Sequence, residues 1–381
     1  MEGKFTVMYY YVTLTLECNL RCKYCYGKCW DESGSLIDES EIDYRIPGEV
    51  SYGIDDLRRF IGRDPNPVIV FYGGEPLLRI GLMREIMDNV PARRYILQTN
   101  GLLLDELEDD YLNRLDSILV SIDGTKRLTD LYRGDGTYVK IIENVREIRG
   151  RGFNGELIAR MTVSNDTLEL EREVLSLIME EHELFDSLHW QLDALFWRGD
   201  FDEELTGRWL KSYSRCVRRL VGIWVRLMVD SGRVLRVYPF LGVARSILLN
   251  ERSRLRCGAG WVMFNVQTDG KITPCPVMAG MRRFYLGDIW STSPRSLRDS
   301  IFVADPCPTC GIYWICGGRC LYANATKLWG SRGFRMVCRT VRDLVESVRA
   351  VAPVIRRLLL EGRIDIEEFN YPRFNSCEII P

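Results

Sequence analysis

Short apolar runs alternate with stretches of helical periodicity over the first half of the chain. This alternation is typical of βα units, in which helices cover parallel strands that are buried on both faces. The pattern therefore predicts an α/β fold whose six strands form an open sheet or partial barrel. The expected strands lie near residues 7–16, 67–72, 94–99, 116–122, 156–163 and 187–195. The expected helices lie near residues 51–61, 79–89, 105–114, 137–149 and 168–180.

The second half of the chain has a different pattern. Long helical periods are expected over 203–229 and 241–250, and a final helix is expected between Cys338 and about residue 360. From residue 257 onward the pattern breaks into short pieces, with Asp269-Gly270 as a hairpin turn between two apolar runs. Such a segment buries too little apolar surface to be ordered alone, so its order should depend on bound metal. The predicted parts are a core over 1–200, a helical bridge over 201–256, a cysteine-rich domain over 257–340 and a C-terminal helix and tail over 341–381.

Composition and charge exclude several classes of protein. The chain has 381 residues, of which 46% are hydrophobic and 27% charged, and its formal net charge is −2. Such a balance gives no global field for nucleic acid or anionic membrane, so neither partner is expected. Because no apolar run approaches the roughly 20 residues of a membrane span and no signal-peptide pattern opens the chain, we expect a cytoplasmic protein.

Cysteine is the unusual residue of this sequence. All of the 13 cysteines except Cys216 and Cys377 fall within residues 18–29 or 257–338. So many thiols in a chain without an export signal indicate metal binding. The two histidines, His182 and His189, belong to neither group, which disfavours a Cys-His zinc finger or a Ser-His-Asp hydrolase.

The first group of cysteines follows an expected strand as Cys18-x3-Cys22-x2-Cys25. Three thiolates on a cubane leave one iron open, whereas structural zinc and closed clusters use four ligands. Cys29 as a fourth ligand is the alternative. The spacing, with Tyr24 before the third cysteine, resembles the signature of radical S-adenosylmethionine (radical SAM) enzymes. That resemblance implies a partial (β/α)6 TIM-like barrel and a [4Fe-4S] cluster that binds SAM and cleaves it to a 5′-deoxyadenosyl radical.

Several segments at the ends of later strands agree with this resemblance. Gly73-Gly74-Glu75-Pro76 is similar to the family's glycine-rich segment, in which glycines allow close backbone approach and Glu75 supplies an acceptor for the SAM ammonium. The alternatives are ordinary strand-to-helix turns, helix caps and surface ion pairs. The resemblance implies further SAM contacts from Asn100, Ser121, Asp123, Arg133 and Arg160.

The second group has seven cysteines, with seventeen residues between Cys257 and Cys275, then the run Cys307-x2-Cys310-x5-Cys316-x3-Cys320, and finally Cys338. This order resembles the C-terminal SPASM domain of peptide-modifying radical SAM enzymes, such as the sactisynthase-like and anaerobic-maturase-like proteins. Two zinc ribbons are the alternative, although the paired Cys-x2-Cys knuckles that they use are absent. The resemblance implies two auxiliary [4Fe-4S] clusters. Only seven thiolates serve two cubanes, so one iron is expected to be open or bound by a different residue. The first of these clusters would use Cys307, Cys310, Cys316 and Cys338, and the second would use Cys257, Cys275 and Cys320.

The function implied by these resemblances is modification of a residue in a peptide or protein substrate. The outcome would be a thioether, a crosslink, an epimerised residue or an oxidised one. The expected cofactors are SAM and three [4Fe-4S] clusters, and the expected electron donor is of the ferredoxin or flavodoxin type. The alternatives are a radical SAM enzyme that acts on a small molecule or tetrapyrrole and a non-catalytic zinc or iron-sulfur module. The residue that serves as catalytic acid or base stays unassigned.

Overall fold

The computed structural model describes residues 7–25, 41–181, 184–193 and 201–374. The chain folds into two compact units, each assembled from separate segments. The first unit comprises residues 1–122, 129–158 and 258–302, and the second comprises 123–128, 159–257 and 303–381.

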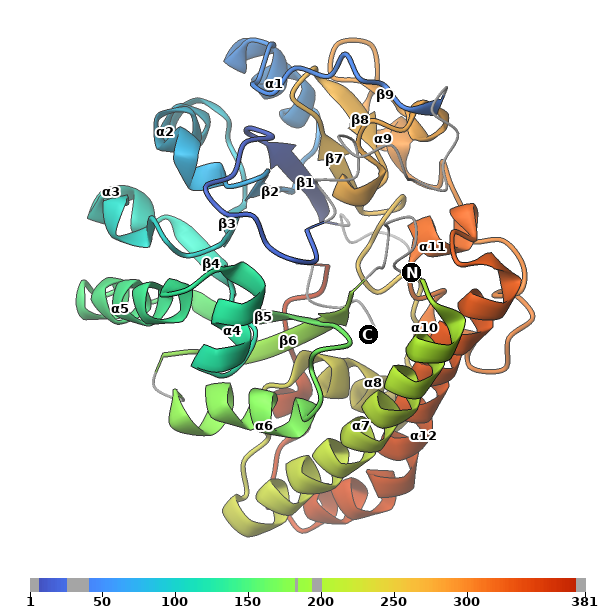
Figure 1. The fold of residues 1–381 in the computed structure, drawn as a ribbon. Helices are drawn as coiled ribbons and strands as arrows, with labels where there is room; N and C mark the ends of the chain where they lie inside the picture. The colour runs from blue at the N-terminus through green and yellow to red at the C-terminus, as the bar shows by residue number, and fades with distance from the viewer. Residues whose placement is uncertain (1–6, 26–40, 182–183, 194–200, 375–381) are drawn as a thin grey trace. The chain divides into compact units, whose positions relative to one another are not determined.

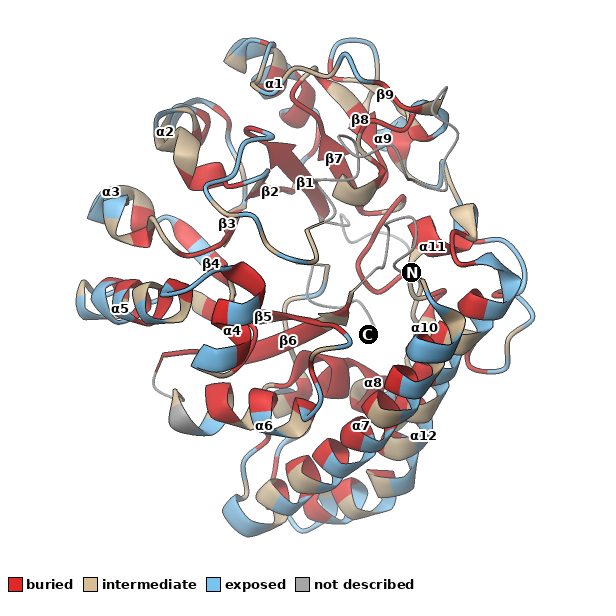
Figure 2. Cartoon of the chain, in the orientation of Figure 1, coloured by how far each residue is buried: buried red, intermediate tan, exposed pale blue. Residues whose placement is uncertain are grey.

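The first unit is built on one sheet with the strand order β4-β3-β2-β1-β7-β8-β9. Neighbouring strands are parallel in the part β4-β3-β2-β1-β7, whereas β8 is antiparallel to both of its neighbours, β7 and β9. β1 is buried along its whole length, which explains its continuous apolar run (Figure 2). The strands are β1 (Met8–Thr13), β2 (Pro67–Tyr72), β3 (Arg94–Thr99), β4 (Leu115–Ser121), β7 (Met263–Val266), β8 (Lys271–Thr273) and β9 (Gly287–Asp288).

Helices α1, α2 and α3 lie along one face of the strands β1–β4 (Figure 1). The ends of α1 carry the charges that a helix dipole favours, because Asp55 and Asp56 lie in its first turn and Arg58 and Arg59 in its last. The helices of this unit are α1 (Ile54–Ile61), α2 (Ile80–Asn89), α3 (Asp109–Leu112), α5 (Thr137–Gly150) and α9 (Pro294–Leu297), and α4 (Lys126–Arg133) belongs partly to each unit. Short 3₁₀ turns cover Pro76–Arg79, Leu104–Glu106, Pro276–Met278 and Arg282–Phe284.

The second unit contains two long helices, α7 and α12, which pack side by side. Asp202 caps the start of α7, since its side chain accepts a hydrogen bond from the Leu205 amide, and Gly232 ends the helix with a left-handed φ of 63°. β5 (Glu156–Val163) begins in the first unit and continues into the second, where β6 (Ser187–Leu192) is its neighbour. The helices are α6 (Leu170–Leu175), which continues as a π turn over Ser176–Glu180, α7 (Glu203–Ser231), α8 (Tyr238–Leu249), α10 (Tyr313–Cys316), α11 (Leu321–Thr326) and α12 (Gly330–Leu360), and a 3₁₀ turn covers Ile366–Phe369.

The predicted α/β class is confirmed, because all six expected strands are present as β1–β6 with helices between them. The expected hairpin is also confirmed, since β7 and β8 are antiparallel on either side of Asp269-Gly270. The four-part division of the chain stays a prediction.

Three expected helices differ from the structure. The last helix does not follow Cys338 but begins at Gly330, because Phe334 and Val337 already belong to its buried face. The helix expected over 241–250 begins at Tyr238, since a proline is tolerated in the first turn. The helix expected over 105–114 is a 3₁₀ turn and the short α3, separated where Glu108 is extended (φ −70°, ψ 147°).

Candidate functional site

The first three cysteines lie in a loop after β1, which we call the cysteine loop (Cys18, Cys22 and Cys25). Cys18 is exposed, and Cys22 and Cys25 are half-buried. The amide of Leu20 donates to Cys18 Sγ at 3.4 Å, and the amide of Cys25 donates to the Cys22 carbonyl at 3.1 Å. Although Cys18 as a residue is exposed, the protein atoms around its thiol partly desolvate it, and this desolvation, together with the nearby negative groups Glu75 and Cys25, raises the pKa of the Cys18 thiol. The loop therefore brings the charges of Cys18 and Cys25 close enough to influence each other.

The Gly73-Gly74 segment runs directly against the chain that leads into the cysteine loop. The amide of Gly74 donates to the Thr15 carbonyl at 2.9 Å, and the amide of Glu75 donates to the Glu17 carbonyl at 2.8 Å. A Cβ atom on Gly74 would stand 2.1 Å from the Glu17 carbonyl oxygen. Only glycine allows this approach, so the end of β2 and the start of the cysteine loop are held at backbone contact.

The Glu75 carboxylate is completely buried and holds the end of β3. One oxygen accepts from the Leu77 amide at 3.0 Å and from Thr99 Oγ1 at 2.7 Å, and the other accepts from the Asn100 amide at 2.7 Å. Burial raises the pKa of Glu75 to about 7, even though these hydrogen bonds favour the charged form. In this structure the carboxylate thus positions Asn100.

Two non-cysteine side chains lie at the sulfur atoms of the cysteine loop. The Asn100 side-chain amide is 3.9 Å from Cys18 Sγ and donates to Asn19 Oδ1 at 2.7 Å. The Arg133 guanidinium is 4.0 Å from Cys22 Sγ and lies over the Tyr24 ring, 5.5 Å from its centroid. N–H donors and a cation near sulfur stabilise the negative charge of thiolates that ligate a cluster.

The remaining residues expected at the SAM site lie at strands β4 and β5. Ser121 is the last residue of β4 and is half-buried. Asp123 is buried and accepts a hydrogen bond from the Thr162 amide at 2.9 Å, so it holds the end of β5. Arg160 donates to Gln191 Oε1 at 3.0 Å, while its Nε is buried without a hydrogen-bond partner. Arg160 therefore keeps a donor for a further acceptor.

Four cysteines of the second unit share one neighbourhood, which we call the four-cysteine cluster: Cys307, Cys310, Cys316 and Cys338. The amide of Cys310 donates to the Cys307 carbonyl at 3.0 Å. Burial, with added repulsion from Cys338 and Cys307, raises the pKa of Cys316 to about 11, and Cys307 and Cys310 act on Cys338 in the same way. Mutual repulsion of this kind requires the four sulfur atoms to lie near one another.

The other predicted auxiliary ligands lie in both units. Cys257 is buried in the second unit, directly after Arg256, which donates to the Ile315 carbonyl at 2.8 Å. Cys320 belongs to the same unit and its thiol accepts from the Ala323 amide at 3.5 Å. Cys275 is buried in the first unit, after β8. Their ligation of one cluster stays a prediction.

Two residues at the four-cysteine cluster escaped the sequence analysis. Asn324 is buried, donates to Cys307 Sγ at 3.3 Å and binds both the amide and the carbonyl of Ala304. The Arg342 guanidinium is 4.0 Å from Cys310 Sγ. Neither residue belongs to a cysteine motif, so no spacing in the sequence indicates them.

The donor set of the cysteine loop and of the four-cysteine cluster fits iron-sulfur clusters. The thiols are free of disulfides, they are the soft ligands that such clusters use, and N–H groups surround them. In the described residues, no three Cys, His, Asp or Glu side chains converge tightly enough to hold a single metal ion. A cubane is larger than one ion and needs its ligands farther apart.

Three cysteines, Cys29, Cys216 and Cys377, belong to none of the predicted ligand sets. Cys216 is buried in α7, and its thiol donates to the Leu168 carbonyl at 3.7 Å. Cys29 and Cys377 lie outside the described residues. None of the helices in the described ranges combines the length and the apolar character of a membrane span.

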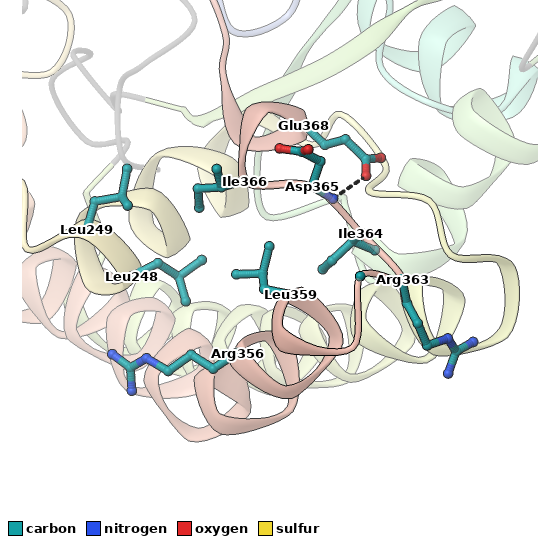
Figure 3. A pocket seen from close by; sticks show the side chains of 10 residues that line it. Leu248, Leu249, Arg356, Leu359, Arg363, Ile364, Asp365, Ile366 and Glu368 are labelled. Carbon is teal, nitrogen blue, oxygen red and sulfur yellow. Dashed lines mark hydrogen bonds between the residues drawn. The ribbon is translucent and has the colours of Figure 1, made fainter.

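A surface groove of about 650 Å³ opens in the second unit, at the C-terminal ends of α8 and α12 (Figure 3). Its lining includes the apolar side chains of Leu248, Leu249, Leu359, Ile364 and Ile366, together with Arg356 and Arg363. The groove contains no cysteine, so it is separate from the candidate cluster sites.

Comparison with known proteins finds a family match for the first part of the chain. Residues 12–178 match the family model of the radical SAM superfamily. The chain is 30% identical to the pre-heme d1 synthase of Dinoroseobacter shibae, over 40% of this chain and 36% of that protein. It is 24% identical to the cysteine-type anaerobic sulfatase-maturating enzyme of Clostridium novyi, over 68% of this chain and 70% of that protein. The chain thus spans little more than a third of the first relative's length.

A solved structure shows the same fold over nearly the whole chain. Histidine-tagged anSMEcpe with bound AdoMet has a TM-score of 0.70 and 18% sequence identity, and it covers 96% of this chain and 99% of its own. This similarity confirms the predicted α/β fold of the partial-barrel type.

Proposed function

We propose that the protein is a radical SAM enzyme that uses SAM and a [4Fe-4S] cluster to modify a residue of a peptide or protein substrate, because residues 12–178 match the model of the radical SAM superfamily. The observation that supports this proposal is the arrangement at the cysteine loop. The Asn100 amide and the Arg133 guanidinium lie at its sulfur atoms, and the Gly73-Gly74 backbone runs against the same loop. Three thiolates hold the cluster there and leave one iron for SAM. When bound, the reduced cluster and SAM together supply a 5′-deoxyadenosyl radical.

The chain's own residues bind and orient SAM in this proposal. The Gly73-Gly74 backbone gives its methionyl group room to approach, and Glu75 and Pro76 fix the turn. Arg133 and Arg160 neutralise the SAM carboxylate, since guanidinium is the side-chain group that best matches a carboxylate. We assign the SAM site to Tyr24, Gly73, Gly74, Glu75, Pro76, Asn100, Ser121, Asp123, Arg133 and Arg160.

Two auxiliary [4Fe-4S] clusters complete the proposal. The four-cysteine cluster holds one of them, with all four irons ligated by thiolate. Cys257, Cys275 and Cys320 hold the other, whose fourth iron takes a non-thiolate ligand or the substrate. A substrate sulfur or nitrogen bound there would have a lowered pKa and be fixed for reaction.

A peptide is the favoured substrate because the fold is that of anSMEcpe, which has also been solved with bound AdoMet and a Cp18Cys peptide. An electron carrier of the ferredoxin or flavodoxin type would reduce the clusters. A small-molecule or tetrapyrrole substrate is the second candidate, and the 30% identity to pre-heme d1 synthase favours it.

Reductive SAM cleavage tests the proposed activity. The full chain is reconstituted anaerobically with iron and sulfide, reduced with dithionite and assayed for 5′-deoxyadenosine. Replacing the three cysteines of the loop by Ala should remove about four irons per chain and abolish the product. Cys216→Ala is the matched control and should retain both. Cleavage that persists in the triple variant would contradict the assignment.

Substrate class is tested separately with the wild-type protein. Candidate peptides, including those encoded by reading frames beside this one, and a set of tetrapyrroles are incubated with enzyme, SAM and dithionite, and products are identified by mass spectrometry. A mass change in a peptide supports the proposal, and a change confined to tetrapyrroles supports the second candidate.

A further inference from the structure

A stripe of arginines runs along one face of α12. Arg332, Arg335, Arg339, Arg342 and Arg349 follow one another at spacings of three, four, three and seven residues, which place them on the same side of a helix. All five are exposed, whereas Val337, Val341, Leu344, Val345 and Val348 form the buried face against the unit's core. We call these five residues the arginine stripe.

The charge of the stripe is largely uncompensated. Arg332 forms an ion pair with Glu203 of α7 at 2.6 Å. Among the described residues, no ion pair joins Arg335, Arg339, Arg342 or Arg349 to a carboxylate, and Asp343 and Glu346 are the acidic residues that lie between them on α12. Neighbouring like charges at these spacings destabilise a helix instead of supporting it. An exposed field of this kind attracts anionic partners and accelerates their binding.

The stripe passes directly beside the four-cysteine cluster. Cys338 lies on α12 one turn before Arg342, whose guanidinium is 4.0 Å from Cys310 Sγ. Cys310 is half-buried, and the residues on either side of Cys307, from Asp305 to Thr309, are exposed. A cluster held by these four cysteines would therefore have an edge near the surface, and the positive charge would lie at that edge.

We propose that the arginine stripe is the docking surface for an acidic one-electron carrier protein. This inference rests on the proposed function, because it requires a [4Fe-4S] cluster on the four cysteines. In the docked complex one electron passes from the reduced carrier to the oxidised cluster. The carrier's centre is oxidised by one electron, the cluster is reduced by one, and no bond or proton moves. The position of Glu346 within the stripe favours a protein with patterned charge over the uniform phosphates of nucleic acid.

Charge reversal tests the surface without touching the cysteines. The stripe variant carries Arg335→Glu, Arg339→Glu and Arg349→Glu, and it keeps Arg342 because that residue contacts Cys310. The matched control carries Arg58→Glu, Arg172→Glu and Arg208→Glu, whose side chains are 54%, 67% and 65% exposed on other helices. Both variants change the net charge equally. The reconstituted full-length proteins are titrated with an acidic [4Fe-4S] ferredoxin at low and high salt.

The ferredoxin should bind the wild type with an affinity that falls as salt rises, and the stripe variant should bind it at least about tenfold more weakly. The control should stay within about twofold of the wild type. In stopped-flow experiments the reduced ferredoxin should bleach the cluster absorption more slowly in the stripe variant. Iron content and dithionite-driven SAM cleavage should be equal in all three proteins.

Equal ferredoxin affinity in the wild type and the stripe variant would overturn the proposal. The proposal would also be overturned if the wild type bound basic cytochrome c as tightly as it binds ferredoxin. Binding of a 20-base-pair DNA that depends on the stripe, without binding of ferredoxin, would overturn it as well. A failure of the proposed function would give a different result. The wild type would then carry its clusters but release no 5′-deoxyadenosine with dithionite.

Discussion

Replacement of Glu75 by Gln separates the electrostatic cost of a buried carboxylate from its role in holding the site. Three donors face the two carboxylate oxygens: the Leu77 amide, Thr99 Oγ1 and the Asn100 amide. Glutamine has the same shape but only one oxygen. In one orientation its NH₂ group faces the Asn100 amide, and in the other it faces the Leu77 amide. Either way one buried backbone N–H loses its acceptor.

Two effects of opposite sign determine the stability of Glu75→Gln. An orphaned buried N–H costs about 1–3 kcal/mol at any pH. Burial raises the pKa of folded Glu75 to about 7, whereas the unfolded residue ionises near 4.5. Between pH 6 and 8 the folded protein thus holds more protons than the unfolded chain, so its stability falls as pH rises, by about 1 kcal/mol for this group. Glutamine does not titrate and avoids this loss.

The expected result is a pH-dependent difference between the two proteins. Glu75→Gln should be less stable than the wild type by about 1–3 kcal/mol at pH 6, and this deficit should shrink by about 1 kcal/mol at pH 8. Urea unfolding under anaerobic conditions at several pH values measures it. Thr99→Ser keeps the hydroxyl donor and serves as the control, which should follow the wild-type pH dependence. SAM affinity of Glu75→Gln should fall at every pH, because displacement of Asn100 reaches Cys18 and Asn19.

A deficit that stays constant from pH 6 to 8 would show that Glu75 ionises at an ordinary pKa in the folded protein. A variant that is more stable than the wild type at pH 6 would refute the cost of the orphaned amide. Normal SAM affinity with reduced stability would limit Glu75 to a structural role.

Three further changes should give distinct results. Replacing the four-cysteine cluster by Ala should remove about four irons per chain and leave dithionite-driven 5′-deoxyadenosine formation intact; iron analysis and chromatography check this. Replacing Cys257, Cys275 and Cys320 by Ala should likewise leave SAM cleavage but abolish the modified product in mass spectra. Asp43, whose side chain is 2% exposed, binds Lys271, Arg282 and Tyr285, so Asp43→Asn should cost about 1–3 kcal/mol in urea unfolding. Burial alone would raise the pKa of Asp43, but hydrogen bonds from Lys271 and Tyr285 contribute to a pKa that is lowered overall. The wild type should therefore lose this stabilisation as the pH falls through the lowered pKa, whereas Asp43→Asn does not titrate and should show no such loss.

The sequence predicted the strands well because each parallel strand is buried on both faces and appears as a short apolar run. The strand bounds 67–72, 94–99 and 156–163 coincide with β2, β3 and β5. It did not predict that β7 would extend the sheet by pairing with β1. Thr13 and Asn265, whose side chains hydrogen-bond across this pair at 2.9 Å, lie 252 residues apart. No local pattern specifies so distant a partner.

The cysteine sets were predictable because their spacing is local, whereas the groups that surround the sulfur atoms were only partly so. Asn100 and Arg133 follow motifs at strand and helix ends. Asn324 and Arg342 reach Cys307 and Cys310 only because α11 and α12 pack beside the cysteine-bearing loop. Tertiary packing, and not sequence spacing, brings these donors to the thiols.

The two cysteine sets share an arrangement that would affect the redox chemistry of any clusters bound to them. Each has an asparagine amide and an arginine guanidinium near its sulfur atoms: Asn100 and Arg133 at the cysteine loop, and Asn324 and Arg342 at the four-cysteine cluster. The positive charges of Arg319 and Lys327 also act on thiols of the four-cysteine cluster. A cluster gains negative charge when it is reduced, so N–H donors and cations at its sulfurs stabilise the reduced form and raise the reduction potential. The amide is closer at the four-cysteine cluster, 3.3 Å against 3.9 Å. Because Asn324 is also fixed by Ala304 on both its amide and carbonyl, its effect on the potential should be the stronger of the two.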